Sequence, residues 1–380
     1  MRTRDGCSHT TRKGNKIVKA SVTKGLGQGF VVEEVELADP VGREVRIEVR
    51  AAGLCHSDLT IATVAGQDFP VVLGHEVAGV VTAVGPEARQ VKIGDHVVAG
   101  LIRACGDCAN CLAARSYICL HPERTQRAAD EPSRITWQGR PVALGLGGLA
   151  GFAQEALIHE NQLAVIPEAM PWAPAALLGC GVITGAGAVL NSADVQAGQS
   201  VVIMGAGGVG MNAVSGARLA GAESVIVIDV EDVKLERAAD FGATHVLNSR
   251  TTDPVAEVRK ITGHGADHVF DCVGLRHVTR QGLEMLAKGG GLYLIGVGGL
   301  DAGIDVQTIA VLTRSQRVQG VDMGSSHLKR DIPMYASLYL QGRMNLDDLV
   351  SQQISLGEIN EGYESLKDGN TLRVVVTDFS

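Results

Sequence analysis

Residues 200–210 read SVVIMGAGGVG, an apolar run that ends in a glycine-rich turn. The run predicts a buried strand, and the small residues that continue to Ala220 predict a helix directly after it. Gly205, Gly207 and Gly210 match the pattern G-x-G-x-x-G. Between a strand and a helix, such a turn lets the backbone approach the pyrophosphate of a dinucleotide, which also meets free N–H groups at the helix start. The segment therefore predicts a dinucleotide-binding turn.

An acidic residue follows at the spacing that such a turn requires. Asp229 lies 24 residues beyond Gly205, at the end of the next apolar run, Ser224–Asp229. A carboxylate at about this spacing accepts hydrogen bonds from the adenosine ribose. No arginine stands among residues 230–232, so we expect repulsion of a 2′-phosphate and a preference for NAD over NADP. A glycine-rich turn without a ligand is the alternative, and the strand, helix and acid around it argue against that interpretation.

The pattern of apolar residues along the sequence changes near residue 190. Beyond it, short apolar runs alternate with helical patterns to about residue 295, which predicts βαβ units and a parallel sheet. Before it, Glu44–Ala52 alternates between apolar and charged residues, and Val77–Val84 ends at Gly85-Pro86, which is typical of an all-β region. We therefore predict an α/β protein with a mostly β domain and a doubly wound Rossmann domain.

The composition agrees with two globular domains. The 380 residues are 45% hydrophobic and 20% charged, a balance typical of globular proteins whose domains run to roughly 100–200 residues each. The net charge of −8 argues against a nucleic-acid surface. The 48 glycines show no period of three, which excludes collagen.

Two segments bear on cellular location. Residues 1–15 are basic and lack an apolar run, so we predict a disordered leader rather than a secretory signal. Ala169–Ala193 is uncharged and long enough to cross a bilayer, but its prolines and glycines are expected to break or weaken a single helix. A buried segment beside a functional site explains it better. We therefore expect a cytoplasmic protein, bound to neither membrane nor nucleic acid, whose cysteines form no disulfides.

Four of the eight cysteines lie within 15 residues. Cys105, Cys108, Cys111 and Cys119 give C-x2-C-x2-C-x7-C. Four thiolates on one loop complete a tetrahedral shell around zinc and leave no open position, so this would be a structural ion. An iron–sulfur cluster and a disulfide pair are the alternatives. A reducing compartment and the ligand spacing favour zinc.

Further motifs flank this loop. Upstream, Cys55-His56-Ser57-Asp58 precedes GHEVAG at 74–79, and downstream LGCG occupies 178–181. Taken singly, such a Cys or His is more often a buried core residue. Together with the four-cysteine loop and the GAGGVG turn, in this order, the motifs resemble the zinc-dependent medium-chain alcohol dehydrogenases. The resemblance extends from about Lys16 to Phe379.

The resemblance implies a second, catalytic zinc. Its ligands would be Cys55, His75 and Cys180, with Glu76 beside the metal as a transient ligand. Three protein ligands leave the fourth position for water or substrate, which suits catalysis. Asp58 would hydrogen-bond the other imidazole nitrogen of His75. The leftover Cys7 and Cys272 match no ligand position.

The resemblance also implies positions for cofactor and substrate. His56 and Arg373 would contact the pyrophosphate, and Thr184 and Val209 would press against the nicotinamide. Leu101 and Leu146 would line an aliphatic substrate pocket together with Ser57 and Ile295. The full set of cofactor positions that we expect is His56, Thr184, Gly205, Gly207, Gly208, Val209, Gly210, Asp229, Lys234, Ile295 and Arg373.

The implied chemistry is hydride transfer between an alcohol carbon and C4 of the nicotinamide. Ser57 would accept the alcohol proton and pass it on through the cofactor ribose. The best-known relatives end this relay with a histidine five residues after the first ligand cysteine, where this chain has Thr60. Either Thr60 and water carry the proton away, or His56 assists.

The substrate expectation is a primary alcohol, aryl or allylic, because residues 185–191 (GAGAVLN) look like bacterial enzymes for such alcohols. The alternatives are a glutathione-dependent formaldehyde dehydrogenase and a non-catalytic NAD-binding relative. The formaldehyde branch places an arginine four residues past the last structural cysteine, where this chain has Glu123.

The expected organisation has two domains. Residues 16–181 and 323–380 would form a GroES-like catalytic domain, and residues 182–322 the Rossmann NAD-binding domain. We expect two zinc ions and one NAD per chain, a small-molecule alcohol or aldehyde as substrate, and a homodimer or homotetramer.

Overall fold

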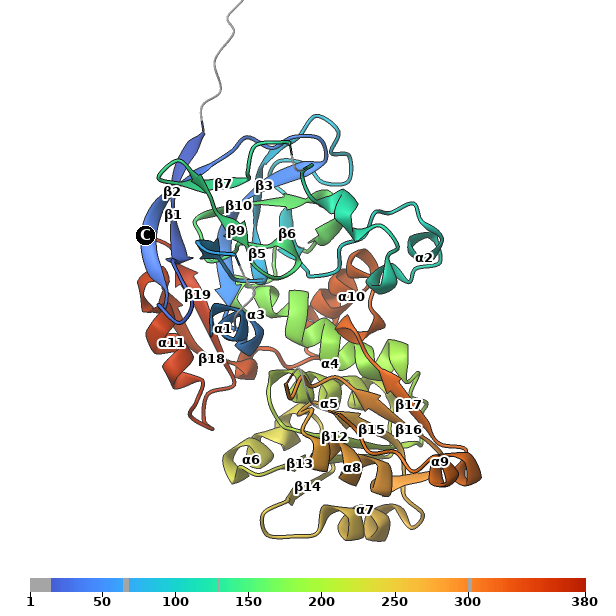
Figure 1. Cartoon of the computed structure of the whole chain (residues 1–380). Coiled ribbons are helices and arrows are strands. Elements are labelled where there is room, and N and C mark those ends of the chain that lie inside the picture. The colour runs from blue at the N-terminus through green and yellow to red at the C-terminus, as the bar shows by residue number, and fades with distance from the viewer. Residues whose placement is uncertain (1–14, 64–67, 129, 300–302) are drawn as a thin grey trace, which may run out of the picture.

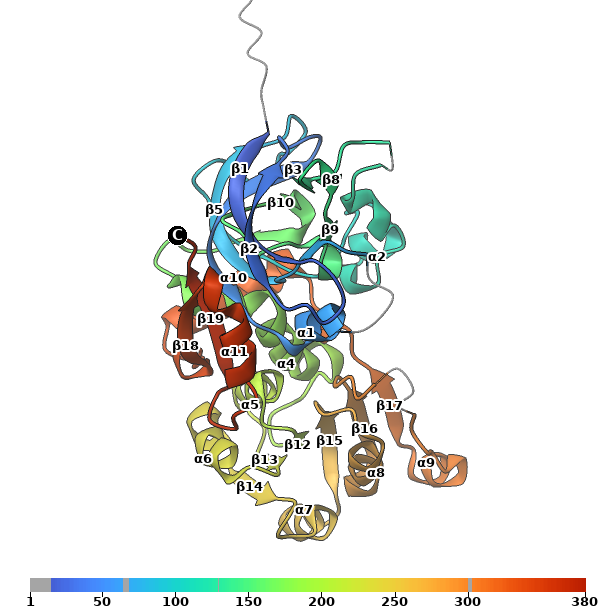
Figure 2. The ribbon, with the colours of Figure 1, turned by 60° about the vertical axis from the view of Figure 1, so that its left-hand side comes forward.

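The computed structural model describes residues 15–63, 68–128, 130–299 and 303–380, in two lobes (Figures 1 and 2). Apart from Asn15, the predicted leader lies outside the described residues, as does Cys7. One lobe holds residues from the N-terminal half of the chain together with its last segment, coloured red in Figure 1. The other lobe is made of residues from about 200 to 320. The α/β prediction with a mostly β domain and a Rossmann domain is confirmed.

The Rossmann lobe is built on a parallel sheet. Within the described residues its strand order is β14-β13-β12-β15-β16-β17, all parallel. In this order the chain moves outward from β12 in one direction, and then returns to start again on the other side at β15. In doubly wound sheets ligands bind outside the carboxyl ends of the strands where the order reverses, and in this sheet that point lies between β12 and β15.

The bounds of the elements of this lobe agree closely with the predicted alternation. Its strands and helices are β12 (Ser200–Met204), α5 (Gly208–Ala220), β13 (Ser224–Asp229), α6 (Asp232–Phe241), β14 (His245–Asn248), α7 (Pro254–Thr262), β15 (Ala266–Asp271), α8 (Arg276–Met285), β16 (Leu286–Leu294), α9 (Thr308–Arg314) and β17 (Arg317–Gly320). Strands β12, β13 and β15 are almost wholly buried, because helices cover both faces of a parallel sheet.

The catalytic lobe contains two mixed or antiparallel sheets. One has the order β8-β7-β2-β1-β4-β9, and the other β11-β6-β5-β3-β19-β18, with β10 also paired to β3. Its strands are β1 (Lys16–Thr23), β2 (Val31–Leu37), β3 (Glu44–Gly53), β4 (Val71–Val72), β5 (Glu76–Val84), β6 (His96–Ala99), β7 (Ile135–Trp137), β8 (Arg140–Pro141), β9 (Ala143–Leu144), β10 (Glu155–His159), β11 (Leu163–Val165), β18 (Val350–Ser355) and β19 (Arg373–Asp378). Its helices are α1 (His56–Thr63), α2 (Ala109–Leu112), α10 (Leu328–Leu340) and α11 (Ile359–Ser365).

The end of the chain completes this lobe. Strand β19 pairs antiparallel with β3, with Val375 opposite Gly53 and Val376 opposite Ala52. Both strands are buried here, and Val374, Val375 and Val376 are fully inaccessible. The pairing places Arg373, at the start of β19, beside the end of β3 that leads to Cys55.

One prediction about the apolar stretch needs correction. Its prolines and glycines do not interrupt the helix: α3 (Trp172–Leu177) and α4 (Ile183–Gly187) are joined by a π-helical turn, and a continuous helix runs over Trp172–Ser192. The prolines are tolerated because Pro171 is the N-cap and Pro174 lies in the first turn, where backbone N–H groups have no helical partner.

The glycines of this helix allow close packing on both lobes. A Cβ at Gly179 would lie 2.0 Å from the Ala99 carbonyl oxygen of β6, and one at Gly185 would lie 2.1 Å from the Val209 carbonyl oxygen of α5. The helix is apolar and long enough to span a membrane, yet 89% of its most apolar window is buried inside the protein. It is thus a core helix shared by the lobes, and the domain boundary predicted at 181/182 falls within it.

Candidate active site and metal centres

The glycine-rich turn joins β12 to α5 as its sequence indicates. Gly205 has φ 95°, a left-handed conformation that glycine adopts without strain. A Cβ at Gly210 would lie 1.8 Å from the Gly205 carbonyl oxygen, so only glycine fits where the helix crosses the turn. Asp229 ends β13, and its Oδ2 accepts a hydrogen bond of 2.7 Å from the Ala206 backbone N–H. The acid is therefore held against the turn, where a ribose beside a bound pyrophosphate would lie.

Four side chains with metal-binding atoms converge in the catalytic lobe. The ligand atoms of Cys55, His75, Glu76 and Cys180 all lie within 4.8 Å of one another. They come from three segments: Cys55 follows β3, His75 and Glu76 lie at the start of β5, and Cys180 lies on the π-helical turn. His75 Nε2 is 3.3 Å from Cys180 Sγ.

The donor set fits a zinc ion. Two sulfurs and one imidazole nitrogen are the ligand types of catalytic zinc, with a fourth position left over. Glu76 is fully buried, and neither of its carboxylate oxygens has a hydrogen-bond partner among the described residues. Burial raises the pKa of Glu76 to about 7, against the opposing effect of the Arg373 charge. A buried carboxylate without hydrogen-bond partners is costly. The charge of Arg373 offsets part of that cost, and a metal ion held by Cys55, His75 and Cys180 would offset more.

Two buried residues surround the cluster. Asp58 Oδ2 lies 2.9 Å from His75 Nδ1, although the two atoms are outside hydrogen-bond geometry, and Asp58 Oδ1 accepts from the Gly74 backbone N–H. The Tyr363 hydroxyl donates to the Cys55 carbonyl oxygen at 3.2 Å. Together these contacts orient the segments that carry Cys55 and His75, as supporting residues do in metal sites.

Arg373 connects the metal-binding cluster to the dinucleotide turn. Its Nε lies 3.9 Å from Glu76 Oε1, and its side chain is almost completely buried. On the other side its guanidinium covers the first turn of α5, since a Cβ at Gly208 would lie 2.5 Å from Arg373 Cζ. One cation thus touches both the carboxylate of the cluster and the helix start that receives a phosphate.

The four-cysteine loop forms a second centre. Cys105 Sγ and Cys111 Sγ are 3.9 Å apart, as are Cys108 Sγ and Cys119 Sγ. Tetrahedral zinc with Zn–S bonds of about 2.3 Å needs sulfurs about 3.8 Å apart, so this shell has the size for zinc. These separations also exclude disulfides, and the described cysteines are all free.

The loop is anchored to the lobe from one side. The Asn161 side chain donates to the carbonyl oxygens of Ala104 and Cys105, at 2.8 and 3.0 Å. Its own backbone N–H donates to His159 Nδ1 at 3.1 Å. Outward, the loop has little cover: Leu112 is 76% exposed.

The remaining predicted positions gather around the same region. Thr184 is buried on α4 with its Oγ1 3.8 Å from Met323 Sδ, and the neighbouring Gly185 contacts the Val209 backbone. Partial burial, with the charges of Arg373 and Lys234, lowers the pKa of His56 against the opposing effect of Cys55. Ile295 follows β16 at the carboxyl edge of the sheet, with its N–H bonded to the Asp271 carbonyl oxygen.

The predicted proton relay starts beside the cluster. Ser57 Oγ lies 3.7 Å from Cys55 Sγ. Thr60, which stands where relatives have a histidine, donates its hydroxyl to the His56 carbonyl oxygen one turn earlier in α1. Leu101 and Leu146 are half-buried, and a Cβ on Gly147 would lie 3.0 Å from Leu101 Cδ2, so the two predicted pocket residues lie close to each other.

Comparison with known proteins agrees with this arrangement. Residues 42–168 match the alcohol dehydrogenase GroES-like domain, and residues 208–339 match the zinc-binding dehydrogenase family. Over 374 residues the chain is 35% identical to the S-(hydroxymethyl)glutathione dehydrogenase of Paracoccus denitrificans, covering 94% of this chain and 99% of that one. The chain belongs to the zinc-dependent medium-chain alcohol dehydrogenases.

Solved structures of medium-chain alcohol dehydrogenases share the fold. A zinc-binding-domain alcohol dehydrogenase from Burkholderia ambifaria superposes with a TM-score of 0.91 at 36% identity, covering 96% of this chain and 99% of that one. The benzyl alcohol dehydrogenase of Acinetobacter calcoaceticus does so with 0.89 at 31% identity, over the same shares. This chain is therefore an oxidoreductase of that family, which uses zinc and NAD(P) and acts on small alcohols or aldehydes.

Sequence reasoning about this medium-chain alcohol dehydrogenase missed three site residues. Tyr363 supports Cys55 from 308 positions away, and Met323 contacts Thr184 from 139 positions away, so no local pattern could reveal them. Arg103 stands two residues before the first cysteine of the loop and faces a cavity beside Leu146. The one feature of the sequence that could have indicated a role for Arg103 is its positive charge two residues after Leu101, a predicted pocket residue.

Proposed function

We propose that this protein is an NAD-dependent dehydrogenase of primary alcohols, aryl or allylic, that also runs in the direction of aldehyde reduction. The observation that carries the proposal is the position of Arg373, which contacts both Glu76 of the metal-binding cluster and the start of α5 at Gly208. A dinucleotide phosphate at that helix start and a metal at the cluster would be neighbours. This is the proximity that hydride transfer between a bound alcohol and a nicotinamide requires.

In this proposal Cys55, His75 and Cys180 hold one zinc ion, Glu76 lies beside it, and the four cysteines of the 105–119 loop hold a second. The catalytic zinc supplies a Lewis acid that lowers the pKa of an alcohol, and NAD supplies the hydride acceptor. Ser57 Oγ, exposed and next to Cys55, accepts the alcohol proton. The Thr60 hydroxyl donates a hydrogen bond to the backbone of its own helix. This hydrogen bond must break before Thr60 can pass the proton on.

The preference for NAD rests on charge at the end of β13. Asp229 lies against the glycine-rich turn and is followed by Val230, Glu231 and Asp232, so acidic residues follow the strand end where the adenosine ribose of a bound dinucleotide is expected. The Asp229 carboxylate also accepts bonds from the backbone N–H groups of Val230 and Glu231, which hold it in place. We expect NADP to be used much less well than NAD.

Glutathione-dependent formaldehyde oxidation is a second candidate of equal standing. Its support is the 35% identity to the S-(hydroxymethyl)glutathione dehydrogenase of Paracoccus denitrificans over nearly the whole of both chains. Against it stands Glu123, an exposed acid where that branch is expected to place an arginine for the glutathione carboxylate. The aryl assignment has its own support in the 31% identity to a benzyl alcohol dehydrogenase.

One set of measurements separates these candidates. NADH formation by the purified, zinc-loaded protein is followed with benzyl alcohol, with cinnamyl alcohol, and with formaldehyde in the presence and absence of glutathione. Turnover of the aryl and allylic alcohols supports the proposal. Formaldehyde oxidation that needs glutathione, without turnover of the free alcohols, would establish the second candidate instead. Repeating the alcohol assay with NADP tests the role of Asp229.

We also propose that the protein assembles as a homodimer through the β17 edge of the Rossmann sheet. In the described part of the chain no further strand pairs with β17. Large apolar side chains are exposed in the same region, namely Leu275, Val297, Ile309 and Leu312. Light scattering would give the mass, and Leu312→Asp is expected to weaken the dimer. A homotetramer and the cytoplasmic location stay predictions from the sequence.

A further inference from the structure

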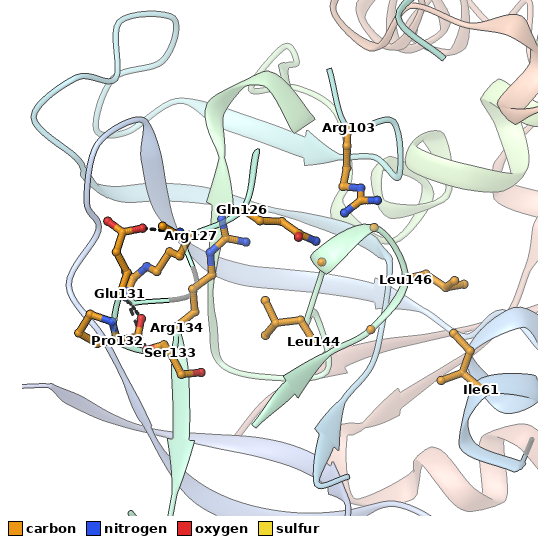
Figure 3. Close-up of a pocket in the computed structure, with 14 residues that line it drawn as sticks. Ile61, Arg103, Gln126, Arg127, Glu131, Pro132, Ser133, Arg134, Leu144 and Leu146 are labelled. Carbon is orange, nitrogen blue, oxygen red and sulfur yellow. Dashed lines mark hydrogen bonds between the residues drawn. The ribbon is translucent and has the colours of Figure 1, made fainter. Parts of the chain in front are cut away.

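A cavity of about 490 Å³ opens in the catalytic lobe, next to the predicted substrate pocket (Figure 3). Its described walls come from α1, from Arg103, from residues 126–128 and 131–134, and from the loop 144–148. In the view of Figure 3, Ile61 and Leu146 lie on one side, and Arg127, Glu131 and Pro132 on the opposite side, with Gln126 and Leu144 between. The cavity thus has an apolar end and a polar end.

The apolar end adjoins the reacting region. Ile61 is on α1, the helix that begins directly after Cys55. Leu101 packs in the same apolar cluster as Ile61, and the backbone at Gly147 rests against Leu101. A substrate that holds its hydroxyl near Cys55 and passes Leu101 would therefore reach the cavity between Ile61 and Leu146.

Three arginines line the cavity. Arg127 and Arg134 lie toward its polar end, whereas Arg103 lies beyond Gln126, on the side of Leu146 (Figure 3), and Glu131 is the one acidic residue in the described wall. Behind the wall, Glu44 receives both Arg127 and Arg134, at 2.6 Å each. Glu44 and Glu131 together offset two of the three arginine charges, so the described wall keeps one positive charge. Gln126 Nε2 and Arg134 Nη1 both point toward Gly148, at 3.8 and 3.9 Å from where its Cβ would lie.

Arg103 differs from the other two arginines. Its side chain is half-buried, and within the part of the chain that the structure describes it takes part in no hydrogen bond and no ion pair. A guanidinium carries five donors in a planar fork that matches a carboxylate. An arginine at a cavity wall that has no partner among the described residues is available to an anionic ligand.

We propose that this cavity is a carboxylate-binding subsite, with Arg103 as its specificity-determining residue. The preferred substrates are then small hydroxy acids, in which an aryl or alkyl spacer separates the reacting hydroxymethyl group from the carboxylate. The carboxylate lies at Arg103 with Gln126 and Arg134 nearby, and the spacer lies between Ile61 and Leu146. This inference rests on the proposed alcohol dehydrogenase function and narrows its substrate class.

The test compares two alcohols that differ in one carboxylate, 4-(hydroxymethyl)benzoate and benzyl alcohol, with 6-hydroxyhexanoate and 1-hexanol as a second pair. For the wild-type protein we expect a lower KM for the acid in at least one pair. Arg103→Gln should raise that KM about 10- to 100-fold, because charge-assisted hydrogen bonds are lost, and leave the KM of the neutral alcohol within about twofold. Arg103→Lys should fall between the two.

Arg140→Gln is the matched control, since it removes the same charge from an exposed position on β8 of the same lobe. Neither KM should change in this variant. Zinc content is measured in every variant, because Arg103 stands two residues before Cys105. An equal effect of Arg103→Gln on the acid and the neutral alcohol, or equal KM values for both in the wild type across the two pairs, overturns the proposal.

Two further outcomes identify what failed. If neither member of a pair is oxidised, the proposed function fails. Calorimetric binding of 4-(hydroxymethyl)benzoate to the zinc- and NAD-loaded protein then tests the cavity alone. Binding that Arg103→Gln abolishes supports the subsite, and absence of binding overturns it. The protein could instead oxidise S-(hydroxymethyl)glutathione in a way that depends on Arg103 and show no preference for any small hydroxy acid. In that outcome Arg103 binds a carboxylate of a peptide substrate, and the proposal of small hydroxy acids as the substrate class is overturned.

Discussion

The two cysteine centres of this dehydrogenase are built in opposite ways. The 105–119 loop gathers four thiols from 15 consecutive residues, beneath a thin cover in which Leu112 is 76% exposed. The other centre takes Cys55, His75 and Cys180 from three segments that span 125 positions, and buries a carboxylate, Glu76, among them. A metal bound by the local set closes a loop and stabilises the lobe. A metal bound by the dispersed set depends on a fold that already exists, and it serves chemistry.

The largest expected effect tests the dispersed centre. Cys180→Ala should lower kcat/KM for the best alcohol by about 1,000-fold or more, because the Lewis acid is lost, while the fold is retained. The zinc content should fall from about two ions per chain to about one. Cys272→Ala is the control, since this cysteine follows β15 and belongs to neither set, and it should keep both ions. Full activity in Cys180→Ala would refute the assignment.

The local centre should respond in stability rather than in rate. Cys108→Ser should release the second zinc and lower the melting temperature by about 5–15 °C, because structural zinc contributes directly to folding. Activity per folded molecule should change much less than in Cys180→Ala. Scanning calorimetry and initial rates on the same preparations measure both. A zinc-depleted Cys108→Ser protein with an unchanged melting temperature would contradict the contrast between the two centres.

Asp58→Asn sharpens the comparison within the dispersed centre. The amide keeps an oxygen that can accept from the Gly74 N–H, but removes the charge 2.9 Å from His75 Nδ1. We expect zinc to be held about 10- to 100-fold less tightly at this centre alone. Activity after dialysis against graded chelator would show it. The same chelator midpoint for variant and wild type would mean that the charge of Asp58 does not support the metal.

The smallest expected effect concerns His159, whose ring accepts a hydrogen bond from Asn161, the residue that holds the four-cysteine loop. Burial, with the charge of Arg43, lowers the pKa of His159 to about 4, so the native protein keeps this histidine neutral. The unfolded chain takes up a proton below about pH 6.5, where histidine ordinarily titrates, so this contribution to stability is present at neutral pH and is lost as the pH falls from about 6.5 to about 4.

The measurement is the melting temperature of wild type and His159→Gln from pH 8 to pH 4. Because His159 Nδ1 holds the turn of Asn161, which in turn holds the loop carbonyls, the wild type should be the more stable at pH 8. The difference of a few degrees should shrink toward pH 4. A difference that stays constant with pH would show that His159 does not titrate in this range.

The same contrast explains what the sequence could predict. The C-x2-C-x2-C-x7-C loop and the turn from Ser200 to Gly210 are local, so spacing and apolar pattern suffice, and the strand and helix bounds of the Rossmann lobe follow closely. Cys55, His75 and Cys180 are far apart, and only the resemblance to a family brings them together. Their approach depends on β3, β5 and the shared helix, which no short pattern specifies.

The errors and omissions also have physical causes. Intrinsic propensity predicts a break in the helix over 172–192, because it weighs the prolines and glycines without their surroundings. Propensity is overridden here by the position of Pro174 in the first turn and by the close packing that Gly179 and Gly185 permit. Arg103 matters because its guanidinium has no hydrogen-bond or ion-pair partner among the described residues. A sequence pattern cannot show this, because it depends on the folded surroundings.

Strand β19 has a consequence for biosynthesis. Arg373 and the strand partner of β3 are made 320 residues after Gly53, with the whole Rossmann lobe in between. At about 5–20 residues per second, a ribosome needs roughly 15–60 s to cover that distance. Through that interval the nascent catalytic lobe lacks the strand that pairs with the end of β3, and Glu76 lacks the arginine that lies beside it in the finished protein. A chain interrupted before residue 373 would therefore lack both the strand and the arginine that complete the active site.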